Sequence, residues 1–134
     1  MPVDNSGDED LSTRPLRHDP TEQGTIFRVV EIPPEKLTGG KFDTDLAFES
    51  MGSHHKPTEE DKKQHASMHF TDSIDYLVVI SGEMHMLMED GTETLLKPGN
   101  CIVQRGTKHA WVNRGDVPCV LAAVLVNAHS VYNS

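Results

Sequence analysis

Residues His69 to Asn113 read HFTDSIDYLVVISGEMHMLMEDGTETLLKPGNCIVQRGTKHAWVN, and this stretch decides the fold. Short runs of β-branched and apolar residues are separated by turn signals at intervals of about ten residues. Asp90-Gly91, which stands between two such runs, is a strong hairpin signal. No part of this half of the chain repeats the 3.6-residue period of an amphipathic helix. The pattern therefore predicts an all-β fold, an antiparallel sandwich or barrel.

The period of two along a strand also predicts which side chains share a face. If His109 points into the barrel, Trp111 and Asn113 point inward as well. If Asp75 points inward, Leu77 does too. The polar and aromatic side chains of this stretch are therefore expected to meet on the inner face of the barrel.

The N-terminal half of the chain is less regular. Residues 1–24 are polar and interrupted by prolines, which predicts a flexible arm, and TIFRVVEI (25–32) is the first predicted strand. We expect one barrel domain over residues 25–130. KFDTDLAFES (41–50) is a further predicted strand. Thr58, followed by three acidic residues, indicates either the start of a short helix or a mobile surface loop.

Composition excludes some classes of protein. The chain has 134 residues and a formal net charge of −9, which argues against nucleic acid as a partner because phosphate binding needs clustered Lys and Arg. No apolar run is long enough to span a bilayer, so we expect a cytoplasmic protein with no membrane contact. Cys101 and Cys119 each lie in an apolar run and are predicted to be reduced core residues.

Polar residues and glycines recur in two spaced groups, His69, Thr71, Asp75 and Gly82, then Gly99, Gln104, Gly106, His109 and Asn113. Their spacing resembles the two motifs of the cupin superfamily, whose members are small double-stranded β-helix or jelly-roll barrels. The family's first motif has two histidines one residue apart, then a glutamate and a glycine. Its second motif has a glycine-containing turn, a histidine and an asparagine. The resemblance covers roughly residues 65–127, with the motif region at 69–113, and it implies a cupin barrel behind an irregular N-terminal arm.

The resemblance also implies a site. A complete cupin site supplies three histidines and one carboxylate, but here Thr71 stands in place of one histidine, and the shorter Asp75 replaces the glutamate. His69, Asp75 and His109 are the predicted catalytic residues, and they are the predicted ligands if a metal is bound. One divalent transition metal (Fe, Mn, Zn or Ni) and a metal-free site both remain open. The predicted substrate contacts are Thr71, Trp111 and Asn113.

Three functions remain open at this point. The first is a small cupin lyase that decarboxylates, dehydrates or isomerises an oxygenated small metabolite bearing a carbonyl or carboxylate, with secondary metabolism as the setting. The second is an Fe(II)-dependent dioxygenase, and the third is a non-catalytic cupin that binds a small molecule. A homodimer is expected, with the apolar run at 25–32 as a candidate edge strand.

Overall fold

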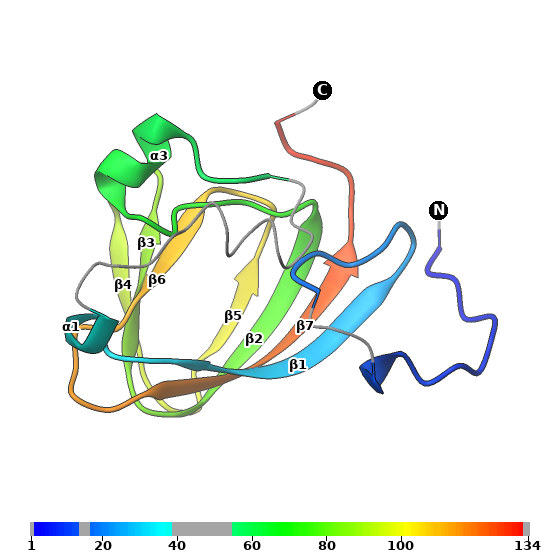
Figure 1. Cartoon of the computed structure of the whole chain (residues 1–134), viewed down its shortest axis with the longest axis horizontal. Coiled ribbons are helices and arrows are strands. Elements are labelled where there is room, and N and C mark those ends of the chain that lie inside the picture. Colours follow the sequence, from blue (N-terminus) through cyan, green and yellow to red (C-terminus); the bar gives the residue numbers. More distant parts are fainter. Residues whose placement is uncertain (1, 14–16, 39–54, 133–134) are drawn as a thin grey trace.

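The computed structural model describes residues 2–13, 17–38 and 55–132, and its strands form two antiparallel sheets (Figure 1). The first sheet has the order β1-β7-β2-β5, with β1 at Thr25–Ile32, β7 at Cys119–Asn127, β2 at Ser73–Ser81 and β5 at Cys101–Gln104. The second has the order β4-β3-β6, with β4 at Glu93–Leu96, β3 at Met84–Met88 and β6 at His109–Val112. The predicted all-β jelly roll is confirmed.

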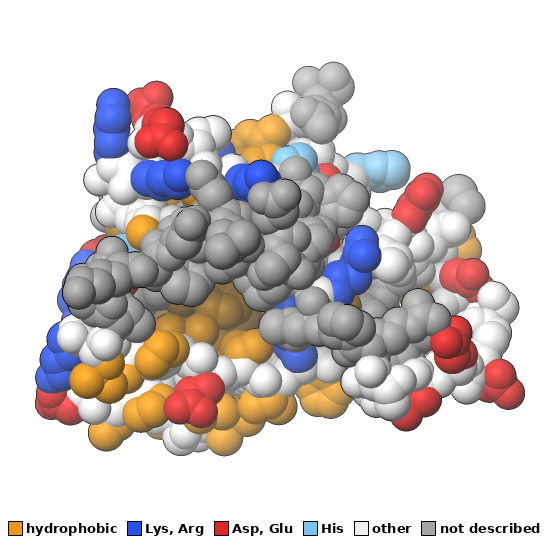
Figure 2. All heavy atoms as spheres, viewed as in Figure 1, with side chains coloured by type: hydrophobic (Ala, Val, Ile, Leu, Met, Phe, Trp, Pro, Cys, Tyr) orange, Lys and Arg blue, Asp and Glu red, His pale blue; other side chains and the backbone are white. Residues whose placement is uncertain are grey.

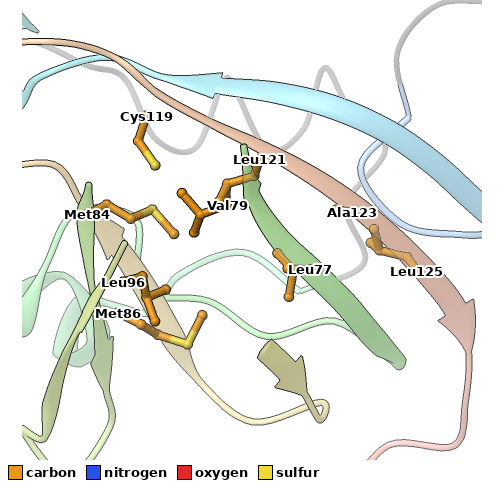
Figure 3. Packing of buried hydrophobic residues seen from close by; sticks show 9 residues of the cluster. All are labelled: Leu77, Val79, Met84, Met86, Leu96, Cys119, Leu121, Ala123 and Leu125. Carbon is orange, nitrogen blue, oxygen red and sulfur yellow. The ribbon is translucent and has the colours of Figure 1, made fainter. Parts of the chain in front are cut away.

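The hydrophobic core lies between the two sheets, as Figure 3 shows. Leu77 and Val79 of β2 and Leu121 of β7 point toward Met84 and Met86 of β3, and all five side chains are at most 5% exposed. Burial alternates along both β2 and β7, as a strand with one face on a core requires. The inward and outward faces predicted from the period of two are therefore confirmed for β2.

Helical segments are short: a 3₁₀ turn at Leu11–Thr13, α1 at Glu35–Thr38 and α3 at Glu59–Gln64. Thr58 caps α3, because its hydroxyl accepts from the Asp61 amide (3.1 Å) while Asp61 Oδ2 accepts from the Thr58 amide (2.9 Å). Asp61 Oδ1 also accepts from Lys108 Nζ at 2.8 Å, which ties the helix to the start of β6. Of the two alternatives for this segment, the helix is confirmed.

Buried residues also occur in the segment that precedes β1. Asp19 is only 3% exposed and Pro20 is buried, although both fall within the predicted flexible arm. The Asn127 amide donates to Gly24 O at 3.0 Å, which fixes the start of β1 beside the end of β7. The predicted strand at 41–50 lies outside the described residues.

Both cysteines are free thiols, but only one is in the core. Cys119 is completely buried, as predicted, whereas Cys101 is exposed on β5. The prediction of a core position is wrong for Cys101, because both faces of this sheet are apolar and an apolar run does not identify the inner one. Across the described ranges, no helix has the length and apolar character needed to cross a membrane.

Gly82 makes the turn between β2 and β3 with a positive φ of 74°. A Cβ at this position would lie 2.3 Å from Pro118 O and 2.9 Å from Cys119 Cα, so the backbone entering β7 leaves no room for a side chain. Gly91, in the hairpin between β3 and β4, also has a positive φ of 88°, but no atom lies within 4 Å of its virtual Cβ. Substitutions at these two glycines therefore distinguish the cost of a left-handed backbone conformation, which both share, from the cost of a steric clash, which only Gly82 has.

We predict that Gly82→Ala lowers the free energy of unfolding by about 3 kcal/mol, since it adds a backbone clash to the cost of a left-handed conformation. Gly91→Ala, the matched control, should cost only about 1 kcal/mol. Urea denaturation of both variants measures the difference. Equal losses would show that the contact with Pro118 and Cys119 is relieved by a small shift of the turn.

Candidate active site

The two motif histidines are brought together by the backbone. His69 N donates to His109 O at 3.0 Å and His109 N donates to His69 O at 2.9 Å, an isolated antiparallel bridge. Their ring centroids are 4.7 Å apart. His109 is 1% exposed and His69 is partly buried. The structure therefore presents two adjacent imidazoles from segments forty residues apart in sequence.

A backbone carbonyl fixes the tautomer of each ring. His69 Nδ1 lies 2.6 Å from Ser67 O, and His109 Nδ1 lies 2.8 Å from Thr107 O. A carbonyl oxygen can only accept a hydrogen bond, so Nδ1 carries the proton in both neutral rings and Nε2 is the basic nitrogen.

Burial keeps both imidazoles in the neutral form. It lowers the pKa of His109 to about 4. Burial is also the largest cause that holds the pKa of His69 well below its usual range, followed by the nearby charges of His109 and His18. At neutral pH both rings are therefore bases with no proton on Nε2.

Asp75, the third predicted catalytic residue, lies on the inner face of β2 and is 5% exposed. Ser73 Oγ donates to Asp75 Oδ1 at 2.6 Å. Burial raises the pKa of the Asp75 carboxyl, and the Ser73 hydrogen bond and the charge of Arg28 partly oppose this increase. The carboxyl is therefore held within the barrel by a hydroxyl donor and a nearby guanidinium.

These side chains do not fit a metal centre with three protein ligands. Within residues 2–13, 17–38 and 55–132, no three His, Cys, Asp or Glu side chains group closely enough to hold a metal ion. His69 and His109 offer a pair of imidazoles, and Asp75 does not complete the set. The metal role of these three residues stays a prediction, and the chemistry below is derived from the side chains alone.

Two residues near the histidines were not predicted from the sequence. The ring of His18 packs edge-on against His69 with centroids 5.0 Å apart, and His18 Nδ1 lies 2.5 Å from Asp19 Oδ1. Arg28 Nη1 donates to the carbonyls of Arg17 (3.0 Å) and His18 (3.2 Å), which holds this segment against β1. Arg28 could have been found, because the alternation of TIFRVVEI places it on the inner face of the strand. The polar sequence around His18 gave no such signal.

The predicted substrate contacts lie in different surroundings. Trp111 packs against the core, with its ring centroid 6.0 Å from that of His109. Thr71 is 3% exposed on the same segment as His69. Asn113 is completely buried, and its Nδ2 donates to Ile32 O and Val117 O, both at 2.9 Å. Both amide hydrogens are therefore used by the backbone, which gives Asn113 a structural role and leaves no donor for a substrate.

The sequence from residue 55 to residue 126 matches the family model described as Cupin domain, and the chain belongs to the cupin family. It is 33% identical over 99 residues to the Oryzines biosynthesis cluster protein J of Aspergillus oryzae, a match that covers 74% of this chain and 49% of that protein. It is 38% identical over 68 residues to a cupin-domain-containing oxidoreductase of Aspergillus ruber, covering 48% of this chain and 34% of that protein. The chain spans between 25% and 55% of the length of the curated relatives it matches.

Solved structures with a similar fold include one described as FeII HppE, with a TM-score of 0.49 and 16% identity, covering 93% of this chain and 62% of that one. Another is a Cupin 2 conserved barrel domain protein from Salinispora arenicola, with a TM-score of 0.47 and 11% identity, covering 78% and 64% of the two chains.

The low pKa of His109 predicts a pH-dependent stability. Between about pH 6.5 and about pH 4 the unfolded chain binds a proton here that the folded protein excludes, so the free energy of unfolding falls as the pH falls. One such histidine contributes a slope of up to about 1.4 kcal/mol per pH unit. His109→Gln should flatten this slope in chelator-treated protein, measured by urea denaturation. The exposed His129→Gln is the control. Parallel pH profiles for His109→Gln and the unmodified protein would contradict the assignment.

Proposed function

We propose that the protein is a small cupin lyase of secondary metabolism, which decarboxylates, dehydrates or isomerises an oxygenated metabolite bearing a carbonyl or carboxylate. The observation that carries this proposal is the pair of buried imidazoles, His69 and His109, each with Nδ1 bound to a carbonyl. The setting is supported by relatives named as biosynthesis cluster proteins, for oryzines in Aspergillus oryzae and for phomopsin in Diaporthe leptostromiformis.

Reactions of this class begin or end with a proton transfer at a carbon beside a carbonyl. In the proposed mechanism of isomerisation, Nε2 of one imidazole removes that proton, the C–H bond breaks, and its electron pair delocalises onto the carbonyl oxygen. The imidazolium that forms is a strong acid, because its buried surroundings disfavour the charge, and it returns the proton to the product. Two rings with centroids 4.7 Å apart allow His69 and His109 to divide removal and return between them.

The remaining residues of the site have supporting roles in this mechanism. Ser73 Oγ holds the Asp75 carboxyl on the inner face, where burial raises its pKa. The guanidinium of Arg28 supplies a positive charge that favours a negatively charged substrate oxygen. The flat ring of Trp111 would face the conjugated part of the substrate. The Thr71 hydroxyl, on the segment that carries His69, is the second proposed substrate contact.

An oxidoreductase is the second candidate. Three relatives, from Aspergillus ruber, Hypocrea virens and Neurospora crassa, are named cupin-domain-containing oxidoreductases. To bind Fe(II), the side chains of His69, Asp75 and His109 would have to lie close together around one point, and the described side chains do not form such a group. This candidate therefore ranks below acid–base chemistry, which needs only the imidazole pair.

Exchange of protons for deuterons tests the proposal without knowledge of the natural substrate. In D₂O, the protein should accelerate exchange at the carbon beside the carbonyl of suitable α-keto or β-keto acids above the buffer rate, as followed by NMR. His109→Gln should reduce this acceleration by about 10²-fold or more, as loss of a general base does. His129→Gln should leave it unchanged.

Two results would count against the lyase. Stoichiometric iron in protein purified without chelator, together with oxygen uptake, would establish the oxidoreductase in its place. Binding of keto acids without any exchange in the unmodified protein would indicate the non-catalytic cupin.

A further inference from the structure

Two buried N–H donors on the inner face of the barrel have no acceptor among the described residues. They are Arg28 Nε on β1 and Trp111 Nε1 on β6, in the opposite sheet. A buried donor without an acceptor costs about 1–3 kcal/mol, and more when it is charged, so native structures seldom keep one. Each of these two donors therefore lacks a hydrogen-bond acceptor within the described part of the chain.

Arg28 shows what kind of acceptor is missing. Nη1 is used by the carbonyls of Arg17 and His18, and no hydrogen bond to a described residue involves the Nε–Nη2 edge. This edge presents two parallel N–H groups, the geometry that binds both oxygens of a carboxylate. Burial lowers the pKa of the Arg28 guanidinium, and the negative charges of Asp75 and Asp19 oppose this change. However, Arg28 forms no ion pair with a described carboxylate.

We propose that Arg28 binds the carboxylate of an organic acid through its Nε–Nη2 edge, and that the substrate of this barrel is such an acid. The inference rests on the proposed function, because it selects the carboxylate-bearing members of the proposed substrate class. The indole N–H of Trp111 is a second donor that is unpaired among the described residues, and the other oxygen atoms of such organic acids are suitable acceptors for it. The charge of Arg28 holds the acid, and the histidines act on its reactive carbon.

The chain has a single tryptophan, so its fluorescence reports from within the site. Titration with sodium benzoate should change the emission of Trp111, and neutral benzamide of matched shape should bind at least about 10-fold more weakly, since a charge-assisted hydrogen bond is lost. Arg28→Gln should remove the preference for benzoate. The matched control is Arg105→Gln, which changes an exposed arginine in the turn after β5.

Arg28→Lys covers the case in which Arg28→Gln does not fold. It keeps the charge but loses the two parallel donors, so benzoate should bind more weakly than to the unmodified protein while the thermal unfolding temperature stays similar. Equal affinity for benzoate and benzamide, or benzoate binding unchanged in both Arg28 variants, would overturn the proposal and leave water as the acceptor. Arginine-dependent binding without proton exchange would overturn the lyase alone.

A separate observation concerns the outer face of the β1-β7-β2-β5 sheet. The strand register aligns Phe27, Val124, Tyr76 and Val103 in one row across the four strands. Phe27 is 76% exposed and Val103 is 62% exposed. The neighbouring row is Val29, Ala122, Val78 and Cys101. Neither row contains a charged residue, although Glu31 is exposed on the same face of β1. Figure 2 shows hydrophobic side chains gathered along the lower border, with an acidic side chain among them.

The exposure and charge of this face favour one kind of partner. Its large apolar side chains are 37% to 76% exposed and lie on three of the four strands, and a continuous exposed apolar face of this kind is typical of an interaction surface. These side chains are Phe27, Val29, Ile74, Tyr76, Ile80 and Val103. Two copies of a chain with a net charge of −9 repel each other, and this repulsion is smallest where a face poor in charged residues meets its equivalent.

We infer that a second copy of this chain packs on the outer face, related by a two-fold axis that sets the same rows of side chains against each other. This arrangement buries the sheet face itself and differs from the predicted addition of strands at the β1 edge. Isologous packing of Phe27 and Tyr76 provides the aromatic contacts that such interfaces favour.

Light scattering coupled to size-exclusion chromatography tests this second inference. The unmodified protein should elute as a dimer and Phe27→Asp as a monomer, because a charge in the centre of the face cannot be desolvated. Leu37→Asp, at a position of similar exposure (73%) on α1, should remain dimeric. A monomeric unmodified protein, or a Phe27→Asp variant that still dimerises through the β1 edge, would exclude this interface.

Discussion

The rest of the site depends on the pair of backbone hydrogen bonds between His69 and His109. These bonds join the segment before β2 to the first residue of β6, and so connect the two sheets at one point. They set the distance between the imidazoles, and the carbonyls two residues earlier in each segment set the tautomers. Backbone geometry thus fixes the position and the tautomer of both bases, while burial keeps them neutral.

Arg28 connects this centre to the N-terminal segment. One side of its guanidinium holds the backbone of Arg17 and His18, which places the His18 ring against His69. The other side faces the barrel interior. A single residue of β1 therefore fixes one wall of the site and supplies a positive charge there, within a chain whose net charge is −9.

Much of the barrel could be predicted from sequence, because the period of two and the turn signals are local properties. The hairpin at Asp90-Gly91 and the inner face of β2 follow from a few neighbouring residues. The position of His18 depends on contacts with residues far along the chain, and its polar surroundings carry no periodic signal. The role of Asn113 could not be predicted either, because an asparagine on an inner face can form hydrogen bonds with the backbone of a turn as readily as with a ligand.

The hydrogen bond from Asn113 to Ile32 has a consequence for the order of folding. It joins residues 81 positions apart, whereas the β3–β4 hairpin closes a short loop between neighbouring strands. Contacts that close long loops lose more chain entropy before they gain stability, so they tend to form late. Docking of β1 would then be a late step, and with β1 come Arg28 and the segment that bears His18. On this view, a nascent chain acquires its hairpins first and becomes competent to bind ligand only when its N-terminal strand has closed the sheet.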